Sequence, residues 1–126
     1  MFLIDNDSII HITRGDIGVI EVCADAADGE QHIFKPGDVV RLCVHERKQP
    51  AKVVLLKDVT VESETTTVDI PLESHDTKIG AMISKPVDYW YEIEVNPDTT
   101  PQTIIGYDAN GPKLFRLYPE GGDNSV

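Results

Sequence analysis

The chain has 126 residues and a mass of 14.0 kDa, the size of one domain, and 40% of its residues are hydrophobic. It carries 22 Asp and Glu against 11 Lys and Arg, a formal net charge of −11 at pH 7. A surface this acidic repels phosphate backbones, which argues against nucleic acid as a partner. No run approaches the roughly 20 apolar residues of a membrane-spanning helix, and no secretory signal peptide is recognisable. We expect a soluble domain over residues 1–118, with no membrane partner, and a flexible tail over 119–126.

Hydrophobic residues recur mainly at every second position, in short runs bounded by Gly, Pro, Asp or Asn, which is typical of half-buried strands. In the first half of the chain, strands are predicted over residues 17–24, 31–34, 39–45 and 53–56, the last with a continuation open as far as residue 61. The segment Lys35-Pro36-Gly37-Asp38 predicts a turn, because Pro fixes φ and Gly tolerates the left-handed conformation.

The run over residues 39–45 alternates most clearly. Val40, Leu42 and Val44 are expected in the core. The opposite face of the same strand should then carry Arg41, Cys43 and His45. Cys43 and the other cysteine, Cys23, have no Cys-x-x-Cys partner, so both are expected to be free thiols.

The second half of the chain predicts strands over residues 65–72, 87–95, 102–107 and 113–118. Pro71 indicates that the first of these lies at a sheet edge or ends there. Ser74–Gly80 predicts one helical turn, with Ser74 as its N-cap and Gly80 at its end. Asn110-Gly111 is a strong hairpin-turn signal.

Seven or eight short strands with one short helical turn favour an all-β fold over any α/β arrangement. We expect an antiparallel two-sheet sandwich, of immunoglobulin-like or jelly-roll-like type.

No catalytic, metal or cofactor site is expected from the polar residues. The histidines stand too far apart for any metal-binding helix motif: His11, His32, His45 and His75. Ser74-His75-Asp76 is better explained by capping of a turn than by a hydrolase triad, because adjacent residues on one turn point apart. Arg14-Gly15-Asp16 matches an integrin-binding tripeptide, but it precedes a strand, where Gly-Asp forms a turn.

Trp90 is the residue most suggestive of an interface. Alternation along residues 87–95 places it on the same face as Glu92 and Glu94, where solvent is expected, and an outward aromatic side chain is a common interface anchor. Two alternatives remain open: the alternation slips at a bulge, or a loop covers the ring.

Five segments follow one another along the chain: Ile12–Asp16, Lys35–Asp38, Ile70–Thr77, Tyr89–Val95 and Thr103-Ile104. In this order they resemble the N-terminal domain of phage baseplate upper proteins. The resemblance covers roughly residues 10 to 118. Three features depart from the family pattern: a longer segment at Ala81–Val87, Glu92 where Asp is usual, and no receptor-attachment region.

The resemblance implies a structural, non-enzymatic component of a phage or prophage tail or baseplate, located in the virion. Its expected partners are copies of itself and other tail or baseplate proteins. An alternative, suggested by Trp90, is a carbohydrate-binding module for host-surface adhesion, although the chain offers few aromatic side chains for it.

Overall fold

The computed structural model describes residues 1–25, 28–47, 50–107 and 111–120. This part of the chain is mostly β with one short helix, as the sequence predicted, but it has nine strands where seven or eight were expected. In chain order the elements are β1 Phe2–Ile4, β2 Ile10–Thr13, β3 Gly18–Val22, β4 Val39–His45, β5 Val53–Thr60, β6 Val68–Leu72, α1 Ser74–Thr77, β7 Val87–Val95, β8 Gln102–Ile105 and β9 Lys113–Tyr118. No helix among these residues is long and apolar enough to cross a membrane.

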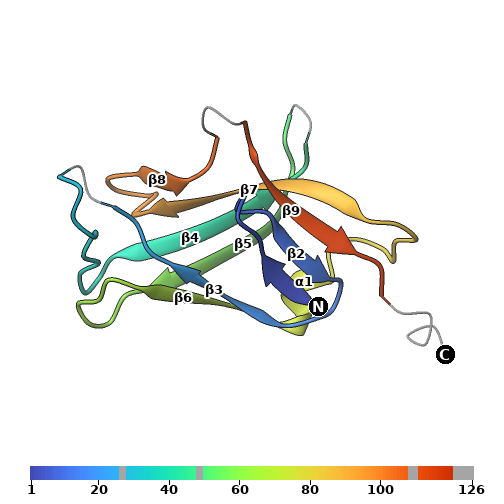
Figure 1. Ribbon diagram of the computed structural model, residues 1–126, viewed down its shortest axis with the longest axis horizontal. Coiled ribbons are helices and arrows are strands. Elements are labelled where there is room, and N and C mark those ends of the chain that lie inside the picture. The colour runs from blue at the N-terminus through green and yellow to red at the C-terminus, as the bar shows by residue number, and fades with distance from the viewer. Residues whose placement is uncertain (26–27, 48–49, 108–110, 121–126) are drawn as a thin grey trace.

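The strands form a large mixed sheet and a small second sheet (Figure 1). The large sheet has the order β1-β2-β9-β7-β4-β5, and β8 pairs with β7 beyond the end of β9. The second sheet contains β3 and β6. The purely antiparallel arrangement expected from the sequence is wrong at one pair, because β2 and β9 run parallel. These strands stand near opposite ends of the chain, so the domain itself supplies the long connection that a parallel pair requires.

The alternation of β4 is confirmed, because Val40, Leu42 and Val44 are fully buried. Their cross-strand neighbours on β7 include Ile93, opposite Leu42, and Tyr91, opposite Val44. We call this buried side of the large sheet its inner face. Side chains of both sheets join one hydrophobic core, to which the second sheet contributes Ile20, Val22, Val68, Ile70 and Leu72.

Several predicted elements have close counterparts in the structure. The predicted strands over residues 39–45, 87–95 and 113–118 coincide with β4, β7 and β9, and the open continuation of the fourth strand is realised in β5. Pro71 lies in β6, which pairs only with β3 among the described strands and is therefore an edge strand, as expected. Gly37 has a φ of 94°, and the amide of Asp38 donates to the Lys35 carbonyl, which confirms the predicted turn.

The strand predicted over residues 31–34 is wrong. Only isolated bridges occur there, between Gln31 and Asp25 and between Phe34 and Thr65. Phe34 is fully buried, so this segment delivers one large side chain to the core without extending a sheet.

The sequence prediction missed the first two strands. β1 and β2 are only three and four residues long, too short to show a repeated alternation. Between them the Asp5 carboxylate accepts hydrogen bonds from the amides of Asp7 and Ile9, which shapes the turn. β2 then pairs with the distant β9, a contact that no local pattern reveals.

The predicted helical turn exists, but its ends differ from the prediction. α1 covers Ser74–Thr77 with Glu73 as N-cap and Lys78 as C-cap. The Ser74 hydroxyl donates to the carbonyl of Gly15 at 2.7 Å and therefore does not cap the helix. Gly80 adopts a φ of 64° beyond the end of the helix.

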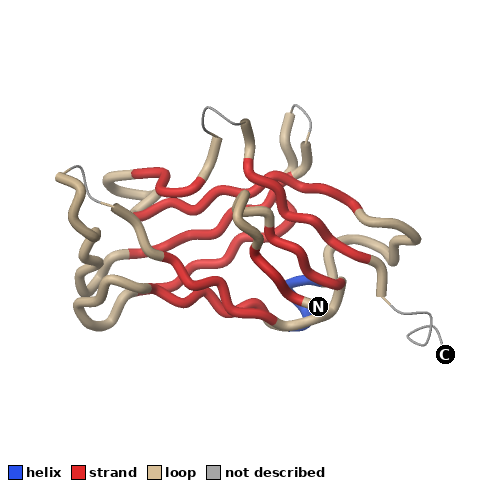
Figure 2. Tube along the Cα trace, in the orientation of Figure 1, coloured by secondary structure: helices blue, strands red, loops and turns tan. Residues whose placement is uncertain are grey.

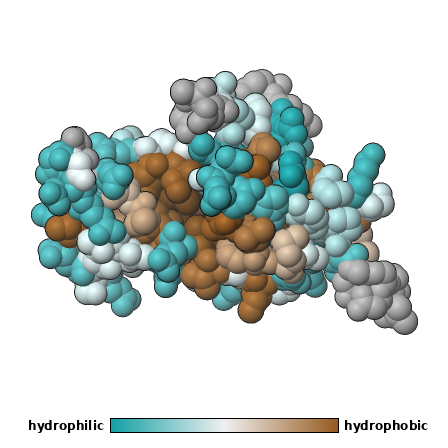
Figure 3. All heavy atoms as spheres, in the orientation of Figure 1, coloured by the Kyte–Doolittle hydropathy of each residue, from teal (hydrophilic) through white to brown (hydrophobic). Residues whose placement is uncertain are grey.

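Strands make up most of the body, and loops gather at its ends (Figure 2). Hydrophobic side chains collect in the middle of the face that carries β1, β2 and β3 (Figure 3). Exposed apolar residues of this region include Leu3, Ile17 and Val19. The predicted turn residue Asn110 and residues 121–126 of the predicted tail lie outside the described residues.

Candidate functional site

Trp90, Glu92 and Glu94 share the side of β7 opposite the core. Tyr91 and Ile93, the residues between them, are buried, so the alternation does not slip here. Trp90 and the two glutamates are each half-buried. We call this side of the large sheet its outer face.

Strand pairing places three further side chains in line with Trp90. Leu114 of β9 lies opposite Trp90 on one side, and His45 of β4 lies opposite it on the other. Val53 of β5, which is 52% exposed, is the next residue beyond His45. The rings of His45 and Trp90 meet edge to face with their centroids 6.2 Å apart. These four residues form a largely apolar row across four strands, which we call the Trp90 row.

An acidic cluster lies on one side of the Trp90 row along the strand direction. Arg41 donates from Nε and Nη2 to both carboxylate oxygens of Asp58, at 2.7 and 2.9 Å, and also contacts Asp98. The hydrogen bond from Arg41 lowers the pKa of Asp58. With Glu92 and Glu94, this acidic half of the outer face has four carboxylates and one guanidinium, a formal net charge of −3.

The opposite side of the row carries the reverse sign. Arg116 binds both carboxylate oxygens of Asp88, at 2.7 and 3.1 Å, and Arg47 approaches the same carboxylate at 3.6 Å. The hydrogen bond from Arg116 lowers the pKa of Asp88. We call Arg116, Arg47 and Asp88 the basic half of the outer face. These three side chains carry a formal net charge of +1, and the bonded pair of His11 and Asp5 lies next to Arg116.

His11 joins β2 to the first turn and to β9. Its Nε2 lies 2.8 Å from Asp5 Oδ2, and its Nδ1 lies 2.7 Å from the Tyr118 hydroxyl. The hydrogen bond with His11 is the main cause that lowers the pKa of Asp5. This chain of hydrogen bonds links the first turn, β2 and the end of β9.

The cysteines are free, as expected. Cys23 is exposed, and Cys43 is half-buried on the outer face. Burial raises the pKa of the Cys43 thiol, and the charges of Glu92 and Glu94 raise it further. A raised pKa keeps the thiol protonated at neutral pH, which makes Cys43 a poor nucleophile.

The Arg14-Gly15-Asp16 segment has a structural role. Arg14 donates to the carbonyl of Gly80 at 2.6 Å and forms an ion pair with Glu120. Asp16 pairs with the N-terminal amine. These internal contacts occupy the side-chain charges that an integrin would need.

Thr77 fastens the same loop to α1. It is fully buried, its hydroxyl donates to the Asp16 carbonyl at 2.8 Å, and its oxygen accepts from the Gly15 amide at 2.9 Å. These hydrogen bonds therefore join Ile12–Asp16 to Ile70–Thr77, two of the segments on which the sequence resemblance rests.

Ser74, His75 and Asp76 do not form a nucleophile–base arrangement. Ser74 donates to a backbone carbonyl, while Asp76 accepts from Lys57 Nζ at 2.8 Å. Ligand atoms of Glu73, His75 and Asp76 lie within 4.8 Å of one another, a spacing that would suit a metal ion. Glu73 and His75 are highly exposed, however, and Lys57 competes for the Asp76 carboxylate.

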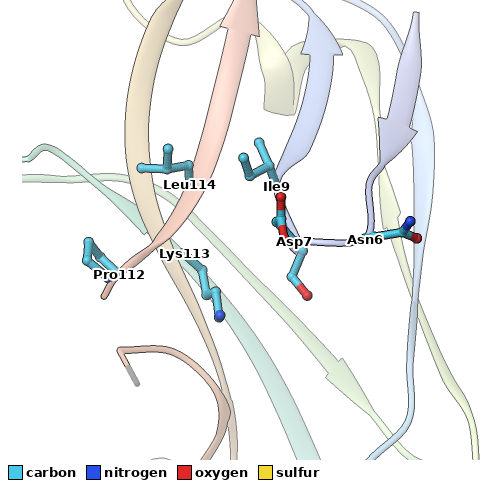
Figure 4. A pocket seen from close by; sticks show the side chains of 7 residues that line it. Asn6, Asp7, Ile9, Pro112, Lys113 and Leu114 are labelled. Atoms are coloured by element: carbon cyan, nitrogen blue, oxygen red, sulfur yellow. The ribbon is translucent and has the colours of Figure 1, made fainter. Parts of the chain in front are cut away.

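A pocket of about 440 Å³ lies between the β1–β2 turn and the start of β9 (Figure 4). Ile9 and Leu114 lie at one end of it, and the oppositely charged side chains of Asp7 and Lys113 extend beside them (Figure 4). Its described lining contains no histidine or cysteine.

Comparison with protein-family models, with curated proteins and with solved structures gives no match for this chain. The function of this chain is therefore inferred from the geometry of its own residues and from the resemblance in its sequence.

Leu114 and Val53 cannot be recognised from the sequence as neighbours of Trp90. Alternation had placed His45 outward, but only the pairing of β9, β7, β4 and β5 brings the row together. Alternation with the buried Phe115 was an available signal for Leu114. It was not one for Val53, which has the parity of the buried Leu55 and comes opposite His45 through a register shift between β4 and β5.

Proposed function

We propose that this protein is a structural, non-enzymatic component of a phage or prophage tail or baseplate, acting in the virion by protein–protein assembly. In this proposal the two sheets form a β-sandwich of immunoglobulin-like or jelly-roll-like type. The ordered sequence segments that resemble the baseplate family support the identity, and the outer face supports the mode of action.

The observation that carries the proposal is the Trp90 row between two clusters of opposite sign. Interfaces commonly combine a central aromatic anchor with a charged rim, because the anchor contributes most of the energy and the rim sets orientation. The second sheet directs its buried residues to the core on the inner face, and among the described strands none lies over the outer face.

The polarity of this face favours a second copy as one partner. A two-fold axis along the Trp90 row would place Trp90 against its own counterpart and each acidic half against the partner's basic half. Such an isologous contact is closed and uses the same patch twice. A two-fold axis along the strands would instead bring like charges together. The charges therefore favour the axis along the Trp90 row.

The test is size-exclusion chromatography with light scattering on the full chain and on two variants. Wild type is expected to form a concentration-dependent oligomer, and Trp90→Ala is expected to be a monomer. Tyr107→Ala is the matched control, because Tyr107 is a highly exposed aromatic residue outside the row, and it should behave as wild type.

A wild-type monomer at every concentration, or an oligomer unaffected by Trp90→Ala, would reject assembly through this face. Glycan binding by a monomer, lost in Trp90→Ala, would favour the carbohydrate-binding alternative. Trp90 would be a single stacking platform in that alternative, since Tyr91 is buried, Tyr118 is bonded to His11, and the highly exposed Tyr107 lies outside the Trp90 row.

A further inference from the structure

A notch interrupts the large sheet where β8 ends and β9 begins (Figure 1). Both strands pair with the same side of β7, β8 as far as Ile93 and β9 as far as Tyr91. Glu92, between these two positions, has no strand partner on this side among the described residues. A cavity of about 400 Å³ lies at the notch, and Lys113 of β9 and Ser8 of the β1–β2 turn line it together with the end of β8.

This cavity continues into the pocket of about 440 Å³ beside the β1–β2 turn (Figure 4). Ser8 and Lys113 line both, so the two form one groove, and each has a volume in the range of small-molecule sites. We call it the notch groove, lined by residues 6–9, 103–107 and 112–114.

Ser8 lies at the junction of the two cavities in an unusual backbone conformation. Its φ is 62°, in the left-handed region that is unfavourable for a residue with a side chain. Its amide donates to the Asp5 carbonyl at 3.0 Å, and its carbonyl accepts from the hydroxyl of the buried Tyr91 at 2.6 Å. Strained residues persist only where their surroundings hold them, and they cluster at ligand sites. The fold therefore fixes a side chain with a hydroxyl group in the middle of the groove.

The notch groove presents both signs of charge and several neutral polar groups. Asp7 contributes a carboxylate and Lys113 an ammonium group, while Asn6, Ser8 and Thr103 add an amide and two hydroxyls. A ligand hydroxyl donates to a carboxylate and accepts from an ammonium group, so it satisfies both. A singly charged ligand would be repelled by one of the two. The lining therefore favours a neutral ligand with several hydroxyl groups.

Tyr107 adds an aromatic ring to this polar groove. It lines the cavity at the notch and is 78% exposed. An exposed ring offers a flat apolar surface on which a ligand can pack. A pyranose sugar combines an apolar C–H face with a rim of hydroxyl groups. A zwitterionic ligand would also match both charges, but it would leave the ring of Tyr107 and the hydroxyls of Ser8 and Thr103 without a role.

We propose that the notch groove binds a neutral saccharide, with one pyranose ring stacked on Tyr107 and hydroxyl groups bonded to Asp7 and Ser8. The proposal does not depend on assembly, because Leu114 is the one groove residue that also belongs to the Trp90 row. It also differs from the carbohydrate-binding alternative, in which the sugar would stack on Trp90.

The experiment is an amide NMR titration of the full chain with three neutral disaccharides: maltose, cellobiose and lactose. The control ligand is the zwitterionic dipeptide glycylglycine. We expect at least one disaccharide to shift the signals of Ser8, Thr103 and Gly106 in a saturable way. Tyr107→Ala should weaken that binding about tenfold, and Tyr107→Phe, which keeps the ring, should bind within about twofold of wild type. Trp90→Ala changes a ring outside the groove and should leave the affinity unchanged.

Ser8→Gly separates binding from folding. Glycine adopts the φ of residue 8 without the steric penalty of a side chain, so this variant should unfold at a urea concentration no lower than wild type. It should nevertheless bind the same disaccharide several-fold more weakly, because it lacks the hydroxyl.

The proposal would be overturned by the absence of a saturable shift with all three disaccharides at tens of millimolar, or by unchanged affinity in Tyr107→Ala or Ser8→Gly. Tighter binding of glycylglycine than of any disaccharide would assign the groove to zwitterions and reject the saccharide. Sugar binding lost in Trp90→Ala but kept in Tyr107→Ala would place the sugar on the Trp90 row and reject the notch groove.

Discussion

The two faces of the large sheet are built from the same strands but differ in burial and composition. On the inner face, Val40, Leu42 and Phe115 are fully buried in the core. On the outer face, the intervening residues are half-buried or exposed and form a row of apolar side chains between charged clusters. Because successive residues of a strand point to opposite sides, one sequence specifies both a core and a solvent-facing surface.

The difference shows which interactions hold the fold and which are available for binding. Burial of large apolar side chains provides most of the folding energy, whereas exposed ion pairs contribute little to stability. The charged clusters of the outer face therefore contribute little to stability, and in the proposed assembly they would set the orientation of the contact.

The largest expected effect comes from the inner face. Phe115→Ala should lower the free energy of unfolding by about 3–5 kcal/mol, because it removes a fully buried ring and leaves a cavity. Its neighbour Leu114, in the Trp90 row, is the matched control, and Leu114→Ala should cost less than half as much. Urea denaturation of both variants measures the difference. Similar losses would mean that the two faces are not distinct.

A smaller effect is expected from acid on the outer face. Arg116 lowers the pKa of Asp88 below its ordinary value of 3.8, so the folded state favours the ionised form more than the unfolded state does. This stabilisation is complete above the unfolded pKa and is lost as the pH falls through the folded pKa. Asp88→Asn should remove about 1 kcal/mol at neutral pH and reduce the loss of stability below pH 3.8.

Urea midpoints recorded for wild type and Asp88→Asn, from neutral pH down to about pH 2, test this expectation. Asp58→Asn, at the other guanidinium-bound carboxylate of the outer face, should behave in the same direction because Arg41 lowers its pKa. A stability difference between wild type and Asp88→Asn that is independent of pH would contradict the assignment.

Alternation along each strand predicted which residues face the core, but it could not predict which strands pair. Val40, Leu42 and Val44 were placed in the core correctly because their period of two is a local property. The pairing of β2 with β9 was not predictable in this way, since it depends on packing between the two ends of the chain. For the same reason, the large sheet was predicted to be purely antiparallel although it is mixed.

The candidate sites were predictable to unequal degrees. Trp90 was identified because its outward position follows from its own strand. Leu114 and Val53 were not, because register is a tertiary property.

The smallest expected effect on stability, and the sharpest test of the outer face, is a charge exchange between its halves. The double substitution Glu92→Lys and Glu94→Lys changes the formal net charge of the acidic half from −3 to +1, and Arg47→Glu changes that of the basic half from +1 to −1; all three residues lie at least partly in solvent. Each change should alter the free energy of unfolding by about 0.5 kcal/mol or less. In the proposed two-fold contact, however, each variant opposes like charges and should form weaker homodimers than wild type.

Mixing the two variants should restore association, because the substituted half of each chain then faces a half of opposite charge. Sedimentation of each variant alone and of the mixture measures this, and added salt should weaken the wild-type dimer by screening the same charges. Recovery in the mixture requires that the acidic and basic halves meet across the Trp90 row. If the mixture associates no better than its components, the two-fold axis along the row is wrong, even if Trp90 itself lies in an interface.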